Sequence, residues 1–185
     1  FDESWLNFLI SIGMKRIKIP SGEINNIPFL KKAASYNLNI ILSTGMSNIK
    51  EIDLAIKEIK KINSKLEISL LHCTSLYPAP YDSLNLEAIK SLQKKFKVHV
   101  GYSDHSLGNL AAISAVAMGA RIIEKHFTLD KKLIGPDHKA SANFKELKKL
   151  IKDLRNLELA LGKGEKTPDI REKQIAAVSR KSWHA

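Results

Sequence analysis

Two histidines stand at the ends of two expected strands, where they could act as metal ligands. His105 closes the segment Gly-Tyr-Ser-Asp-His at 101–105, and His126 lies in Glu-Lys-His-Phe at 124–127. A Gly-Pro-Asp-His turn follows at 135–138. Neutral imidazoles bind divalent cations, and α/β proteins carry out their chemistry where parallel strands finish. The pattern therefore indicates an enzyme, or part of one.

Side chains alternate between the two faces of a strand, and this alternation groups the candidate residues. Ser103 and His105 share one face of one strand, and Glu124 and His126 share one face of the next. One imidazole from each strand could bind a single cation, which Glu124 or Asp137 could orient. A lone histidine would more often be structural, but two at neighbouring strand ends favour the ligand interpretation.

A lysine and a serine surround a turn in Lys-Ile-Pro-Ser-Gly-Glu at 18–23. The Lys18 ammonium, the Ser21 hydroxyl and the backbone N–H groups of the turn could bind a phosphate or carboxylate. Ser-Gly turns are common, so this signal has little specificity on its own. Structural roles are expected for the other histidines, both tryptophans and the single cysteine: His72, His99, His184, Trp5, Trp183 and Cys73.

The composition limits the cellular setting. The net charge of +11 comes mostly from lysines interleaved with acidic residues on expected helices, which is typical of solvated faces and not of a nucleic-acid groove. No apolar run is long enough to span a membrane, and residues 1–4 do not resemble a signal peptide. One cysteine fits a reducing compartment. We expect a soluble cytoplasmic protein that binds neither membranes nor nucleic acid.

Strand and helix patterns alternate along the chain. The expected strands cover residues 16–19, 39–44, 67–73, 97–103 and 121–127. The expected helices start near residue 28 and then cover about 47–62, 84–95, 107–118 and 143–161. Five βα units in series predict a parallel sheet with right-handed crossovers.

The distribution of candidate residues favours a barrel over a doubly wound sheet. They follow at least four successive strands, and a barrel gathers residues from every strand at one rim. A doubly wound sheet instead binds ligand mainly at one switch point. A complete barrel has eight strands and typically about 250 residues. We therefore expect residues 1–161 to form the C-terminal portion of a (β/α)8 barrel, with 162–185 as a linker.

The chain resembles the sialic acid synthases, namely the bacterial N-acetylneuraminate synthases and their legionaminic and pseudaminic acid relatives. The matching segments run in the family's order: 18–23, Leu-Ser-Thr-Gly-Met at 42–46, His-Cys-Thr-Ser-Leu-Tyr-Pro-Ala-Pro at 72–80, 101–105, 124–127 and 135–138. The resemblance implies strands four to eight of a barrel. It also implies that three earlier strands and a C-terminal antifreeze-like domain are absent, so the chain alone is expected to be inactive.

The resemblance further implies the reaction and the role of each residue. Family members condense phosphoenolpyruvate with an N-acetylmannosamine-type sugar and water, and they release phosphate. They act as homodimers with a divalent metal, usually Mn²⁺, with Mg²⁺ or Co²⁺ as alternatives. By position, His105 and His126 would bind the metal and act in catalysis with Glu124; Lys18, Ser21 and Ser103 would hold phosphoenolpyruvate; Tyr77, Glu124 and Asp137 would contact the sugar. Ser75 replaces an asparagine that some members place near the enolpyruvate.

Two other classes of function remain open from the residues. A metal-dependent barrel hydrolase would use the histidines to activate water, but it would normally need a third protein ligand, and no His-x-His strand motif is present. A non-catalytic fragment is the other alternative. The residues also do not fix which acylated sugar is the acceptor.

Overall fold

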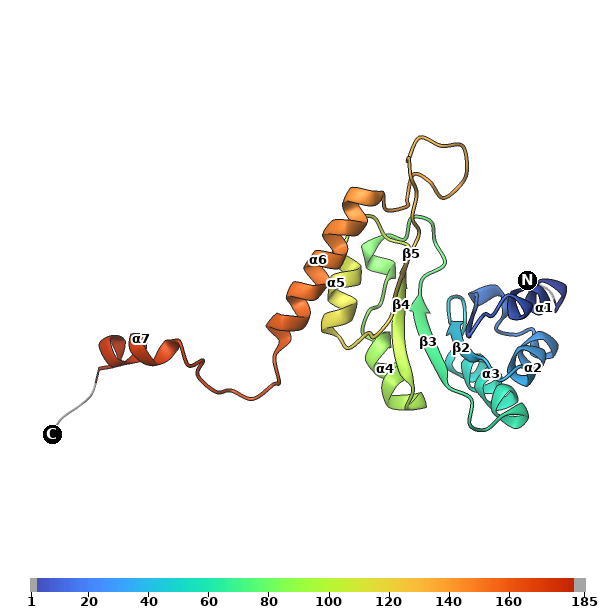
Figure 1. The fold of residues 1–185 in the computed structure, drawn as a ribbon, viewed down its shortest axis with the longest axis horizontal. Helices are drawn as coiled ribbons and strands as arrows, with labels where there is room; N and C mark the ends of the chain where they lie inside the picture. The colour runs from blue at the N-terminus through green and yellow to red at the C-terminus, as the bar shows by residue number, and fades with distance from the viewer. Residues whose placement is uncertain (1–2, 182–185) are drawn as a thin grey trace.

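Five parallel strands form the centre of the structure, a computed structural model that describes residues 3–181 (Figure 1). They are paired in chain order: β1 (Arg16–Ile19), β2 (Asn39–Ser43), β3 (Ile68–Cys73), β4 (His99–Asp104) and β5 (Ile123–Lys125). Every neighbouring pair is parallel. All five strands therefore finish at the same rim, as the βα rhythm predicts. Trp183 and His184 lie outside the described residues.

Four helices connect the strands: α2 (Ile27–Ser35), α3 (Ile49–Ile62), α4 (Ala88–Phe96) and α5 (Leu110–Ala117). Helix α1 (Glu3–Ser11) precedes β1, and α6 (Phe144–Leu161) and α7 (Glu172–Ser179) follow β5. The helices other than α7 lie on one side of the sheet, and short 3₁₀ turns occur at Ser21–Glu23 and Tyr81–Ser83. Helices α3 and α6 each begin with a capping box, Asn48 with Glu51 and Asn143 with Glu146, which satisfies free N–H groups of the first turn. None of the described helices has the length and hydropathy to cross a membrane.

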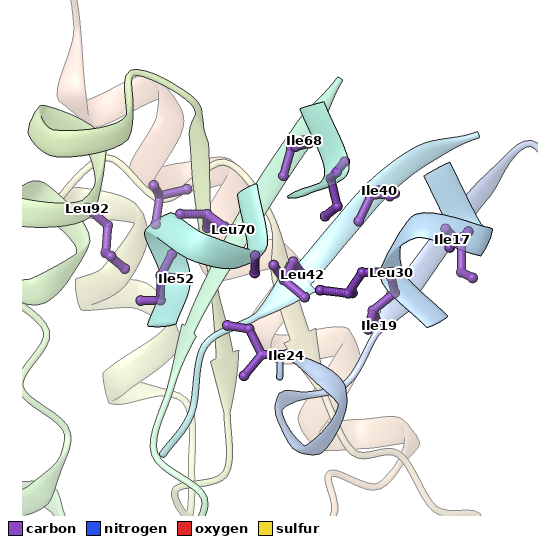
Figure 2. Close-up of a cluster of buried hydrophobic side chains, with 14 of the residues drawn as sticks. Ile17, Ile19, Ile24, Leu30, Ile40, Leu42, Ile52, Ile68, Leu70 and Leu92 are labelled. Carbon is purple, nitrogen blue, oxygen red and sulfur yellow. The ribbon is translucent and has the colours of Figure 1, made fainter. Parts of the chain in front are cut away.

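The hydrophobic core lies between the sheet and these helices (Figure 2). Alternate residues of the strands, such as Ile19, Leu42 and Leu70, pack under the helices and are fully buried. On α3, Ile52 and Ile59 meet the sheet at helical spacing. The other face of each strand is turned away from the helices and is free to carry polar groups.

Several element boundaries differ from the expected ones by one to four residues, and three of these differences have a cause in the path of the backbone. Helices were predicted from 84 and 107, but they begin at Ala88 and Leu110. Asn85 and Gly108 have positive φ angles of 45° and 74°, which an α-helix does not accept. The last strand is shorter than 121–127, because the chain beyond Lys125 leaves β4 and pairs at Phe127 with Ala142.

The chain also contains two helices that the pattern did not predict. Helix α1 precedes the first strand, and α7 lies in the segment expected to be a linker. No residue of α7 is buried, and Figure 1 shows it away from the sheet. The division of the chain into a barrel portion up to residue 161 and a linker from residue 162 stays a prediction.

Strands β1 and β5 form the two edges of the described sheet, as predicted, since each has a single neighbour. Unpaired edges favour association with other chains. We predict that the isolated 185-residue polypeptide elutes from size-exclusion chromatography as species larger than a monomer, increasingly so at higher concentration. Leu159→Lys changes an exposed apolar residue of α6 and is the control. Restoration of the monomer by this substitution, or a monomer at all concentrations, would contradict the edge explanation.

Candidate active site

A cavity of about 360 Å³ opens at the C-terminal ends of the strands. All the predicted site residues except Asp137 line it: Lys18, Ser21, Ser75, Tyr77, Ser103, His105, Glu124 and His126. Asp137 lies at its margin, with Oδ2 3.8 Å from His126 Nδ1. The strand alternation used in the prediction therefore gathers these residues on one side of the sheet. Their roles stay predictions.

Glu124 joins the first strand of the sheet to the last. Its Oε1 accepts a hydrogen bond from the Ser103 hydroxyl at 2.7 Å and lies 3.1 Å from the Lys18 ammonium. Lys18 belongs to β1 and Glu124 to β5, which are opposite edges of the sheet. The sheet must therefore curl strongly enough to bring its two edges face to face across the cavity.

His105 presents a lone pair toward the cavity. Its Nδ1 lies 2.7 Å from the Thr74 carbonyl oxygen, which can only accept, so Nδ1 carries a proton and, in the neutral ring, Nε2 has the free lone pair. Nε2 is 3.3 Å from the Ser103 hydroxyl, whose single proton makes the shorter bond to the Glu124 carboxylate. Burial lowers the pKa of His105, and the nearby His126 lowers it further. A neutral imidazole with a fixed tautomer suits a metal ion.

His126 and Tyr77 complete this end of the cavity. The rings of His105 and His126 have centroids 5.6 Å apart, and Tyr77 packs against His105 at 4.2 Å and His126 at 5.5 Å. Among the described residues there is no cluster of three or more histidine, cysteine or acidic side chains arranged for a metal. A cation held by the two imidazoles would take its other ligands from water or substrate.

The other end of the cavity is built around Gly45. Its N–H donates to the Ser21 hydroxyl at 2.9 Å, and Ser21 Oγ lies 3.2 Å from Cys73 Sγ. A Cβ atom at position 45 would come within 2.4 Å of Ser75 Oγ, 2.8 Å of Cys73 Sγ and 2.9 Å of Ser21 Oγ. Any larger residue would push these three side chains apart. Cys73 is buried, as expected for a packing residue, but no sequence pattern indicated its place in this cluster.

Ser43 is a lining residue that sequence reasoning missed. Its side chain lines the cavity and is 2% exposed, and its hydroxyl has no hydrogen-bond partner among residues 3–181. Leaving a buried hydroxyl without a partner costs free energy, so this hydroxyl is available to a polar ligand or an ordered water in the cavity. The available signal was its position at a strand end, two residues after the inward-facing Ile41.

Comparison with known proteins identifies the family. The model of the NeuB family matches residues 1–166. This chain belongs to the NeuB family. Its relatives include the N,N'-diacetyllegionaminic acid synthases of Legionella pneumophila and Campylobacter jejuni, which are 51% and 49% identical to it, each over 98% of this chain. The chain covers 52% and 55% of those two proteins, about half their length.

Solved structures show the same architecture as this NeuB chain. The N-acetylneuraminic acid synthetase of Leptospira borgpetersenii aligns with a TM-score of 0.88 at 42% identity, over 96% of this chain and 62% of that one. A DAHP synthase of Thermotoga maritima aligns with a TM-score of 0.73 at 25% identity, over 88% of this chain and 50% of that one. The expected fold class, a portion of a (β/α)8 barrel, is confirmed.

His72 lies outside the candidate site, and its environment generates a test of stability. Its Nε2 contacts the Leu84 carbonyl oxygen at 2.8 Å, and burial lowers the pKa of His72 below the ordinary 6.5. The unfolded chain therefore binds this proton more readily, so the free energy of unfolding should fall as pH drops below 6.5. We predict that His72→Gln weakens this dependence between pH 7 and 5 in denaturant titrations.

His99→Gln serves as the control for this measurement, because His99 is an exposed residue. An unchanged pH dependence in the His72 variant, or an equal change in the His99 variant, would contradict the assignment.

Proposed function

We propose that this chain forms the C-terminal part of the catalytic barrel of a nonulosonic acid synthase. The reaction joins phosphoenolpyruvate to an N-acetylated, mannosamine-type sugar with addition of water and release of phosphate. One observation carries the proposal: a single cavity has an ammonium and hydroxyls suited to an anion, at Lys18, Ser21 and Ser43, and beside them two imidazoles suited to a cation. Membership of the NeuB family supports it.

The anion end is suited to phosphoenolpyruvate. Lys18 supplies a positive charge, and Ser21 and Ser43 supply hydroxyl groups around the same space. Ser103 would join them by turning its proton from Glu124 to the anion. Charge-assisted hydrogen bonds of this kind are the stronger ones in proteins. The partnerless hydroxyl of Ser43 would gain an acceptor from a phosphate or carboxylate oxygen, which supports its inclusion. Ser75, beside Gly45, would border the enolpyruvate.

The cation end is suited to a divalent metal, which His105 and His126 would hold through neutral ring nitrogens. Lewis-acid polarisation of the sugar carbonyl is the chemistry that such an ion supplies when bound. The preset tautomer of His105 supports the fit. Imidazole ligands alone would also suit zinc or iron, so manganese rests on the resemblance to the synthases.

The proposed reaction balances without any further reactant. The enol double bond of phosphoenolpyruvate forms a C–C bond from C3 to the sugar carbonyl carbon, and the sugar C=O π bond opens. Water then adds at C2 and gives up one proton, which the former carbonyl oxygen takes to become a hydroxyl. The bond from C2 to the phosphate oxygen breaks, the new C2 hydroxyl loses its proton to form the keto group, and phosphate leaves with the electron pair and that proton. Lys18 and the serine hydroxyls would stabilise the anionic groups throughout. Glu124, held by Ser103, would orient a sugar hydroxyl or the attacking water, and Tyr77 and Asp137 would contact the sugar.

The similarity to named relatives favours one type of sugar. The two relatives named as N,N'-diacetyllegionaminic acid synthases are 51% and 49% identical to this chain. Two pseudaminic acid synthases of Campylobacter jejuni are 42% and 44% identical, and the human N-acetylneuraminate-9-phosphate synthase is 36% identical. A diacetylated sugar of the legionaminic type is therefore our preferred acceptor, ahead of N-acetylmannosamine. The homodimer and the cytoplasmic location stay predictions.

The metal assignment can be tested in a polypeptide that carries this chain at its relatives' length. Chelation should abolish phosphate release, and Mn²⁺ should restore it. His126→Ala should lower kcat/KM by more than about 100-fold, which exceeds the usual effect of residues that only support a metal ligand. His99→Ala, at an exposed position, should leave turnover unchanged. Activity that resists chelation, or near-normal turnover of the His126 variant, would contradict the role of this histidine.

The anion end has its own test. Lys18→Ala should raise the KM for phosphoenolpyruvate by about 10- to 100-fold, as expected for losing a charged hydrogen bond of roughly 1.5–3 kcal/mol. The KM for the sugar should change little. Lys15→Ala removes the same charge from an exposed position nearby and is the matched control. Equal effects of the two substitutions would mean that Lys18 acts only through net charge.

A further inference from the structure

A buried ion pair lies directly behind the candidate site, on the face of the sheet that is turned away from the cavity. Lys125 Nζ lies 2.6 Å from Asp104 Oδ2, and the two side chains are only 5% and 0% exposed. The other ion pairs between described residues have at least one partner more exposed than these two. This pair is therefore the most deeply buried one described.

Ser106 completes the network around the pair. Its N–H and its hydroxyl both donate to Asp104 Oδ1, at 2.9 and 2.7 Å. Lys125 also donates to the Ser106 carbonyl oxygen at 2.9 Å. Both carboxylate oxygens of Asp104 are thus satisfied, and the backbone on each side of His105 is held, since Asp104 precedes it and Ser106 follows it.

The position of the pair in the strands links it to the site. Asp104 and Lys125 are direct register partners, one step beyond the partners Ser103 and Glu124. Lys125 stands between Glu124 and His126, both of which line the cavity. The pair therefore connects the two strand ends that carry His105 and His126, from the side opposite to the imidazoles.

Strand β5 makes few ladder contacts at this end. It is three residues long, and its ladder with β4 consists of three register pairs. Beyond it, Ala142 holds the backbone through hydrogen bonds with the His126 carbonyl and the Thr128 N–H, but these bonds do not join this segment to β4. The side-chain link at Lys125 is therefore the last described contact that ties the chain entering His126 to the strand that carries His105.

Burying two charges is costly, and apolar replacements of such pairs are often neutral or stabilising. Stability alone is therefore a poor explanation for an ion pair at this place. We propose that Asp104 and Lys125 are positioning residues, which set the separation of the His105 and His126 imidazoles for a shared cation. This inference rests on the proposed function where it is tested by enzyme activity, but not where it is tested by the separation of the two imidazole rings.

The test compares the double variant Asp104→Leu/Lys125→Met with the wild type in a polypeptide of the relatives' length. Apolar side chains remove both charges together, and the groups that lose their acceptor are the Ser106 N–H and hydroxyl. We expect Mn²⁺ affinity, measured by electron paramagnetic resonance of free Mn²⁺, to fall by about 10- to 100-fold. We expect kcat to fall similarly, while the KM for phosphoenolpyruvate stays near the wild-type value because Lys18 and Ser21 lie on other segments.

One control and one milder variant separate positioning from general loss of stability. Ile59→Ala opens a cavity in the fully buried core under α3, away from β4 and β5, and should leave Mn²⁺ affinity per folded molecule unchanged. Asp104→Asn/Lys125→Met is the milder variant, because it removes both charges but keeps an acceptor for the Ser106 N–H and hydroxyl. It should lower Mn²⁺ affinity in the same direction as Asp104→Leu/Lys125→Met, and it serves as the test if that variant does not fold.

A crystal structure of Asp104→Leu/Lys125→Met, or of Asp104→Asn/Lys125→Met, gives a readout that needs neither metal nor activity. The centroid separation of His105 and His126, 5.6 Å here, should change by about 1 Å, a misplacement that can cost 100-fold in rate. An unchanged separation with unchanged Mn²⁺ affinity would overturn the positioning role. A wild-type protein that releases no phosphate would instead contradict the proposed function. In that case the separation of the His105 and His126 rings in the variant would still decide whether the ion pair positions them.

Discussion

The curvature of the parallel sheet is the constraint on which the candidate site depends. Parallel pairing in chain order brings the C-terminal ends of all five strands to one rim. Curling then places Lys18 on the first strand 3.1 Å from Glu124 on the last. A flat sheet would separate these residues by four strand spacings, each about 4.8 Å. The ammonium, the carboxylate and the imidazoles can share a cavity only because the sheet already has the curvature of a barrel.

Because side chains alternate along each strand, one face of this sheet carries the core and the other carries the candidate site. Apolar residues such as Ile19 and Leu70 pack under the helices, while the residues between them line the inner side. The ion pair of Asp104 and Lys125 is the exception, because it places charge on the helix-covered face. Its location behind the two histidines makes sense if the geometry of the site needs a link that apolar contacts, which have no direction, do not provide.

Much of this organisation could be predicted from the sequence, because the βα rhythm and strand alternation are local patterns. They predicted the five strands, the parallel sheet and the grouping of residues around His105 and His126. Ser43 and Gly45 were missed because their importance comes from neighbours on other strands: an orphan hydroxyl and a close approach of three side chains are invisible in sequence. The predicted first residues of two helices were wrong, because Asn85 and Gly108 adopt left-handed backbone conformations that delay the start of each helix.

The most direct test of the account is a crystal structure of a polypeptide of the relatives' length that carries this chain, with phosphoenolpyruvate and Mn²⁺ bound. The account predicts the phosphate or carboxylate of phosphoenolpyruvate against Lys18, Ser21 and Ser43. It predicts Mn²⁺ bound by Nε2 of His105 and a ring nitrogen of His126. Phosphoenolpyruvate bound elsewhere, or Mn²⁺ held without His105, would contradict the central claim that one cavity carries both an anion end and a cation end.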